Sequence, residues 1–371
     1  MALKIHRPVL GTGFTGSEDR YILHWMQEFA KALLEKYPDA IDEIYYDEID
    51  RDSGNRPDLS NRLLSKPCIN GDCNDYGLIP IQDTGCVVEN TETGDYIVFT
   101  VDERHHSITS HYLCDKHCRA IYRSHYAPAQ IKWIDEVQGW RHNGVSVDGN
   151  HRVRPWMFPQ FRCSAVENGN IPQTDEFWEN LYQQRQTSEK DIPFAFAGSG
   201  TESFRLTMLS LQEICPDFSI IGRLNYEHFI PHLSRFKIGA SLWADWDRMS
   251  LDLENRDCRQ NGEWCYRDVE YLAAGIPFIR QEYEDSVWGG SYLPNVHYIS
   301  IPLADIKRAF RAGSCNGVAK LYKQKYEEVK DNQELLDAIS RNQHDLWKTW
   351  FSAKASIQKS IEVVEQNLIL A

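Results

Sequence analysis

The segment Arg235–Gln281 reads RFKIGASLWADWDRMSLDLENRDCRQNGEWCYRDVEYLAAGIPFIRQ. Phe236–Leu242 is an apolar run of strand length, and Trp264–Ala274 repeats its apolar residues at helical spacing. Gly275 ends this helix, and Ile276–Ile279 begins a second strand. The segment therefore predicts a strand, a loop, a helix and a strand. The unpaired N–H groups at the start of such a helix suit a phosphate group.

The same alternation of strands and helices starts earlier in the chain. Pro193–Ala197 predicts a strand, Gly198–Thr201 a turn rich in glycine and hydroxyl groups, and Glu202–Glu213 a helix. Phe218–Gly222 predicts the next strand. Strands that alternate with helices form a parallel, doubly wound sheet. We therefore predict an α/β fold for the C-terminal half.

The length of the chain, 371 residues, exceeds what one core of ordinary size accommodates. We predict an N-terminal domain over residues 1–185 and a second domain over residues 186–330. The charged stretch TSEKD marks the boundary. Residues 331–371 predict C-terminal helices, including one over Gln333–Leu370, that pack back on the first domain.

The charge of the chain excludes some classes of partner. The formal net charge is −14, from 40 Lys and Arg against 54 Asp and Glu, which disfavours binding to nucleic acids or anionic membranes. No apolar run is long enough to cross a bilayer, and the N-terminal residues lack the apolar core of a secretory signal. Ten cysteines spread along the chain, with no N-glycosylation sequon, favour reduced thiols and a cytoplasmic location.

A glycine-rich turn follows the first predicted strand. Lys4–Leu10 predicts this strand, Gly11–Gly16 reads GTGFTG, and Asp19–Lys36 predicts a long helix. This pattern matches the dinucleotide fingerprint, although any tight first crossing also needs glycines. The acidic strand Ile41–Tyr45 supplies no single carboxylate suited to the ribose. Because the glycine pattern matches, an NAD(P)-dependent oxidoreductase nevertheless remains an alternative.

Acidic and imidazole groups follow the predicted strand Tyr96–Val101. Asp102, Glu103 and His105 come directly after it. The carboxyl ends of strands in open α/β sheets are where ligands bind, so each of these residues is a candidate general base for a hydroxyl group. The alternative interpretation is a solvated, charged loop.

Two groups of residues raise the question of a metal. The pair Asp245 and Asp247 forms an Asp-x-Asp sequence that could bind Mg²⁺ or Mn²⁺. A zinc site is a second possibility, but its spacing matches no recognised pattern, and residues 115–122 could equally form an amphipathic helix. The candidate zinc ligands are His111, Cys114, His117 and Cys118, with Cys68 and Cys73 further away. We expect no metal.

Three stretches carry a resemblance to a known family. They are FAGSGTESFR (Phe196–Arg205), FKIGASL (Phe236–Leu242) and GEWCYRDVEYLAAGIPFI (Gly262–Ile279). They resemble the nucleotide-sugar-binding domain of GT-B glycosyltransferases, particularly the protein O-glucosyltransferase and capsule xylosyltransferase family. The resemblance implies two Rossmann-like domains that face each other across a cleft. The chain departs from the family at Ala197, where an arginine is usual, and the family is usually lumenal or secreted with disulfides.

The resemblance also implies a nucleoside-diphosphate sugar as donor, a UDP-sugar ahead of a GDP-sugar. Cations and N–H groups would stabilise the charge that grows on the diphosphate as it leaves. Glu270, one turn after Arg267, would bind the ribose or orient the arginine, and a purely structural pair is the alternative. The predicted donor-binding residues are Gly198, Ser199, Gly200, Thr201, Arg205, Gly262, Arg267 and Glu270.

These observations predict an inverting, metal-independent glycosyltransferase that needs no cofactor besides its donor. Residues 194–300 would hold the donor, and residues 1–185 would hold a glycan or glycoprotein acceptor. Asp102 would deprotonate the acceptor hydroxyl. A non-catalytic sugar-binding protein is a further alternative, because Trp243, Trp246 and Trp264 could stack on sugar rings.

Overall fold

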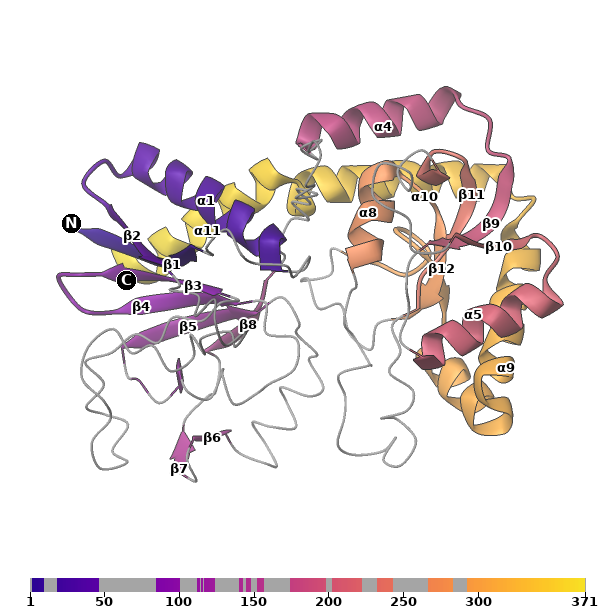
Figure 1. Cartoon of the computed structure of the whole chain (residues 1–371), viewed down its shortest axis with the longest axis horizontal. Helices are drawn as coiled ribbons and strands as arrows, with labels where there is room; N and C mark the ends of the chain where they lie inside the picture. Colours follow the sequence, from indigo (N-terminus) through magenta and orange to yellow (C-terminus); the bar gives the residue numbers. More distant parts are fainter. Residues whose placement is uncertain are drawn as a thin grey trace, which may run out of the picture. The chain divides into compact units, whose positions relative to one another are not determined.

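A computed structural model of the chain describes residues 2–9, 19–46, 85–100, 112–113, 115, 117–123, 140–142, 145–147, 152–156, 174–197, 202–221, 232–242, 266–282 and 292–370. The chain forms two compact units (Figure 1). Unit 1 comprises Met1–Tyr126, Ile131–Pro172 and Ala353–Ala371. Unit 2 comprises Ala127–Gln130 and Gln173–Ser352.

Unit 1 contains a mixed six-stranded sheet in the order β2-β1-β3-β4-β5-β8. The helix α1 (Asp19–Lys36) connects β1 to the parallel strand β2, which confirms the predicted first β-α-β unit. In contrast to a parallel Rossmann sheet, β3 runs antiparallel to both β1 and β4. The strands are β1 (Leu3–Val9), β2 (Ile41–Tyr46), β3 (Gly85–Asn90), β4 (Tyr96–Thr100), β5 (Cys118–Arg123) and β8 (Val153–Pro155). A separate hairpin pairs β6 (Trp140–His142) with β7 (Val145–Val147).

The reversal of β3 follows from the short turn that joins it to β4. The N–H of Asn90 donates to the carbonyl of Asp95 at 2.8 Å, and Gly94 takes a φ of +75° within the turn. A turn this tight allows only an antiparallel pair of strands. Thr93-Gly94-Asp95 therefore forms the turn of a β3–β4 hairpin.

The C-terminal helix completes the core of unit 1. Figure 1 shows α11 (Ala353–Val364) beside α1 on one face of the sheet, and the π-helical turn η6 (Glu365–Ile369) follows α11. The side chain of Asn90 donates a hydrogen bond to the carbonyl of Leu368 at 3.0 Å. One cluster of buried side chains joins the three helical elements to the sheet, and it includes Trp25, Phe29, Val88, Phe99, Tyr122, Ile361, Val364 and Leu368.

A partly buried hydrogen bond between β1 and β3 makes unit 1 sensitive to acid. His6 Nε2 lies 2.7 Å from Glu89 Oε2, and this bond holds the pKa of Glu89 below its ordinary value of 4.5, although burial alone would raise that pKa. The unfolded chain then takes up this proton at a higher pH than the folded chain. The stabilisation is therefore fully present above pH 4.5 and is lost as the pH falls through the folded-state pKa.

Glu89→Gln should lower the free energy of unfolding at pH 7 by about 1 kcal/mol, because the bond is charge-assisted but partly exposed. The variant should also lose less stability than the wild type between pH 7 and pH values below 4.5. Urea unfolding at both pH values measures this difference. Glu28→Gln on an exposed position of α1 is the control. Equal acid sensitivity of wild type and Glu89→Gln would contradict the prediction.

Unit 2 contains a five-stranded sheet in the order β10-β9-β11-β12-β13, and every neighbouring pair is parallel. Helix α5 connects β9 to β10, and α8 connects β11 to β12. The predicted α/β class with a parallel, doubly wound sheet is confirmed for this unit. The strands are β9 (Ile192–Ala197), β10 (Phe218–Ile221), β11 (Phe236–Ala240), β12 (Phe278–Gln281) and β13 (Ile299–Ile301). The helices are α4 (Asp175–Thr187), α5 (Glu202–Ile214), α8 (Tyr266–Ala274), α9 (Leu303–Val329) and α10 (Gln333–Leu346).

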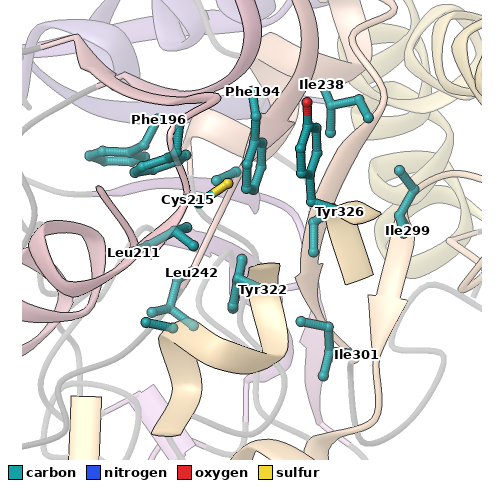
Figure 2. Close-up of a cluster of buried hydrophobic side chains, with 14 of the residues drawn as sticks. Phe194, Phe196, Leu211, Cys215, Ile238, Leu242, Ile299, Ile301, Tyr322 and Tyr326 are labelled. Atoms are coloured by element: carbon teal, nitrogen blue, oxygen red, sulfur yellow. The ribbon is translucent and has the colours of Figure 1, made fainter. Parts of the chain in front are cut away.

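Helices cover both faces of this sheet. On one face, Ile238 and Tyr326 share a buried cluster with residues of α5, and the ring of Tyr326 stacks on Phe194 with centroids 4.7 Å apart (Figure 2). On the other face, Gly239 lies against Tyr271 of α8. Alternate residues of β11 therefore contact opposite layers, as expected for a buried parallel strand.

The unit boundary lies ahead of α4, whereas the predicted boundary lies after residue 185. The buried face of α4 includes Trp178 and Leu181, and α4 packs on α8. Its Arg185 is buried and donates to the carbonyl of Phe236, at the start of β11, at 2.8 Å. These contacts assign α4 to unit 2, and the chain passes between the units at Pro172 and Gln173.

The predicted helix over Gln333–Leu370 is interrupted. The π-helical turn η5 (Trp347–Phe351) follows α10, and Ser352 then takes an extended conformation with φ −63° and ψ 153°. The division between unit 2 and unit 1 falls directly after Ser352. The break thus coincides with the return of the chain to unit 1.

Candidate functional site

In the sheet of unit 2, the direction in which the chain adds successive strands reverses at β9. From β9 the chain moves to β10 on one side, and it then returns to β11 on the other side of β9. Connections that leave neighbouring strands in opposite directions open a crevice at the carboxyl ends of those strands, where open α/β sheets bind ligands. This point lies beyond Ala197 of β9 and Ala240 of β11.

Two helices begin at this edge of the sheet. Because α5 and α8 join parallel strands, each helix runs back antiparallel to the strands and starts at their carboxyl ends. Unpaired N–H groups and the positive end of the helix dipole favour an anion there. Arg205 lies in the first turn of α5, and Arg267 lies in the first turn of α8. The backbone therefore places both predicted arginines at the same edge.

Arg267 forms an ion pair within α8. Its Nη1 donates to Oε2 of Glu270, three residues later. The Glu270 side chain is completely buried, and that of Arg267 is 16% exposed. The helical pair that the sequence left open as a structural alternative is thus present. The pair ties the Arg267 guanidinium to Glu270, and the predicted donor-binding role of both residues stays a prediction.

A second pair of buried charges lies beside the first. Nε of Arg280 on β12 lies 3.3 Å from Oδ2 of Asp268, and each side chain is only 1% exposed. Ser241, directly after β11, donates its hydroxyl to Asp268. These residues were not among the predicted site residues. An available signal was Arg280, which directly follows the apolar stretch Ile276–Ile279.

Most of the other predicted residues lie outside the described part of the chain, so they stay predictions. In chain order, Asp102 follows β4 of unit 1, and Gly198 follows β9 of unit 2. The structure does not test the oxidoreductase turn Gly11–Gly16. The residues outside the described ranges are Asp102, Glu103, His105, Gly198, Ser199, Gly200, Thr201, Trp243, Asp245, Trp246, Asp247, Gly262 and Trp264.

The helix proposed for residues 115–122 is wrong, because Cys118–Arg123 is the strand β5. Its pairing with β4 on one side and β8 on the other outweighs the local helical spacing. Cys118 lies in the core, and burial raises the pKa of its thiol to about 12. His117 instead contacts Asp95 at 3.1 Å. The described residues include no group of three His, Cys, Asp or Glu that could hold a metal ion.

None of the described helices combines the length and the apolar character that crossing a bilayer requires.

Comparison with known proteins gives matches in structure alone. No family model and no curated protein sequence matches the chain. A glycosyltransferase from Rickettsia africae matches with a TM-score of 0.45 and 11% identity, over 99% of each chain. The Anabaena protein Alr3699/HepE, in complex with UDP-glucose, matches with a TM-score of 0.42 and 7% identity, over 98% of this chain and 100% of that one.

The pneumococcal O-GlcNAc transferase GtfA, in complex with UDP and GlcNAc, matches with a TM-score of 0.40 and 9% identity, over 99% of each chain. These solved structures include glycosyltransferases, the class that the sequence resemblance names.

Proposed function

We propose that this chain is a glycosyltransferase that moves a sugar from a nucleoside diphosphate to a hydroxyl group of a glycan or glycoprotein. One observation carries the proposal: the strand order of unit 2 reverses between β9 and β11, and two helices with an arginine in the first turn begin at that edge. Helix N-termini and guanidinium groups both bind phosphate groups, which supports a diphosphate as the ligand.

The chemistry of the reaction explains why such an edge is useful. As the bond between sugar and diphosphate breaks, negative charge grows on the departing oxygen. Arg267, held by Glu270 at the start of α8, would stabilise this charge. Arginine stays protonated at neutral pH, so it can replace a divalent metal in this role. We therefore propose a metal-independent reaction, and a UDP-sugar as donor ahead of a GDP-sugar.

Inversion at the sugar carbon requires a base that removes the proton of the acceptor hydroxyl. We propose Asp102 for this role, with Glu103 and His105 as alternatives, because they follow the strand β4.

We also propose a cytoplasmic location. It is supported by four cysteines of the described residues that are free thiols, namely Cys86, Cys118, Cys215 and Cys315.

Thermal unfolding with UDP, GDP, CMP, NAD and NADP tests the proposal. A ligand present at one hundred times its Kd stabilises the folded state by about 2.7 kcal/mol, so one nucleoside diphosphate should raise the Tm by several degrees. The dinucleotides should have no effect. Stabilisation by NAD or NADP alone would instead support the oxidoreductase alternative at Gly11–Gly16.

Repeating the nucleotide titration in the presence of EDTA tests whether a metal ion is required. The nucleotide-induced shift and the transfer of sugar should both be unchanged when EDTA is present. Loss of both would contradict the metal-independent mechanism and favour a metal at Asp245 and Asp247.

A further inference from the structure

Three residues from three different elements meet at the edge where α8 begins. Ser241 follows β11, Asp268 lies in the first turn of α8, and Arg280 belongs to β12. We call them the Asp268 cluster. Ile279 faces the cluster of apolar residues that includes α9, so Arg280, the next residue, faces α8. The three side chains are buried between the sheet and that helix.

Each polar group of Ser241 is bound to a different element. Its N–H donates to the carbonyl of Ile279 on β12 at 2.9 Å, and its carbonyl accepts from the hydroxyl of Tyr322 on α9 at 2.7 Å. Its hydroxyl donates to Asp268 on α8. The end of β11 is therefore fixed to β12, α9 and α8 at once.

The middle of α8 is also held closely against β11. A Cβ added to Gly239 would lie 2.8 Å from the ring of Tyr271, which is closer than side chains pack. The hydroxyl of Tyr271 lies 3.4 Å from the carbonyl of Ala240. With its middle in contact with the strand and its first turn bound through Asp268, α8 has little freedom to shift along the sheet.

Stability alone does not account for a buried ion pair at this place. Removing two charges from water is costly, and apolar side chains of similar volume often give equal or greater stability. A pair of fixed charges does give the helix one defined position. Arg267 shares the first turn of α8 with Asp268, so its position depends on the same contacts.

We propose that the Asp268 cluster positions the first turn of α8, and with it Arg267, for binding of the diphosphate. This inference rests on the proposed function and adds to it two positioning residues, Asp268 and Arg280, that act through α8 and do not touch the donor. A misplacement of about 1 Å can lower the rate of a reaction between positioned groups up to a hundredfold, so loss of the cluster should also have a measurable effect on affinity.

The double variant Asp268→Asn with Arg280→Met tests the proposal, because it removes both charges together and leaves neither one buried alone. Calorimetry with UDP should show the Kd raised about tenfold, while the variant remains folded. Hydrogen exchange should become faster at the backbone amides of Val269–Leu272 and stay unchanged in β9. Arg185→Met is the matched control, since Arg185 is a buried arginine at the opposite end of β11. The control should bind UDP as the wild type does.

Ser241→Ala provides a second variant that removes only the hydroxyl bound to Asp268. It should raise the Kd for UDP about threefold with little change in Tm, because the ion pair remains. UDP binding equal to that of the wild type in both folded variants would overturn the positioning role. If the double variant does not fold, unchanged binding by Ser241→Ala alone overturns it. A wild-type protein that binds no nucleoside diphosphate would overturn the proposed function itself, and the wild-type titration separates these two failures.

Discussion

Replacing Arg267 and Glu270 together with glutamine should lower the affinity for UDP about a hundredfold, since two charge-assisted hydrogen bonds to phosphate contribute roughly 3 kcal/mol. The two substitutions are made together because Glu270 is completely buried. Two neutral amides can hydrogen-bond to each other at the same spacing, so the fold should persist. Calorimetric titration with UDP measures the affinity, and urea unfolding measures the stability.

The single variant Arg267→Gln should behave differently. It should lose UDP binding to the same extent, but it should also lose about 3–5 kcal/mol of stability, because the buried Glu270 carboxylate would lose its ion pair with Arg267. The difference in stability between the single and double variants therefore reports the buried charge, and their common loss of affinity reports the diphosphate contact.

The pair Asp305 and Arg308 on α9 is a matched control. It has the same spacing of three residues, but the Arg308 side chain is 77% exposed. Exposed pairs contribute little, so Asp305→Asn with Arg308→Gln should change neither stability nor UDP binding. Should the Arg267 and Glu270 double variant bind UDP as tightly as the wild type, Arg267 would have no part in the donor site.

The elements around this site could be predicted because their apolar patterns are local. The strand β11, the helix α8 and the strand β12 fall where the spacing of apolar residues placed them. The pairing of Arg267 with Glu270 could be predicted, because side chains three residues apart on a helix lie on the same face. These predictions need no knowledge of what the helix packs against.

The Asp268 cluster could not be predicted in the same way. Asp268 in a first helical turn resembles an ordinary acid that complements the helix dipole. Its partner Arg280 lies twelve positions further on, and the two meet only because α8 folds back along β11 and β12. An arginine within the buried strand β12 was the local sign that a polar group had to face it.

The boundary between the units shows the same limit. The stretch TSEKD is charged and exposed, as linkers are, but it connects two elements of one unit. Helix α4 belongs to unit 2 because Trp178 is buried and Arg185 donates a hydrogen bond to the carbonyl of Phe236. Composition cannot distinguish a charged linker between domains from a charged connection within one.

Gly275→Ala should destabilise unit 2 by about 3 kcal/mol, of which roughly 1 kcal/mol is backbone strain and the remainder overpacking. Gly275 takes a φ of +61° at the end of α8, a conformation that disfavours any residue with a Cβ. An added Cβ would also lie 2.6 Å from the ring of Tyr182 and 2.9 Å from the hydroxyl of Ser340. Neither neighbour can withdraw easily, because Tyr182 stacks on His344 with centroids 3.7 Å apart and Ser340 donates to the carbonyl of Gly275 at 2.6 Å.

Gly94→Ala separates the two contributions, because Gly94 has a φ of +75° but no neighbour closer than 3.9 Å to an added Cβ. It should cost only about 1 kcal/mol, the strain alone. Urea unfolding of both variants provides the comparison, and equal losses would show that the contact with Tyr182 yields at no cost. Two structural features therefore require glycine at position 275, the positive φ and the close contact with Tyr182 and Ser340. The sequence revealed the first, since the helix must end there, whereas the second exists only because α4 and α10 close over the end of α8.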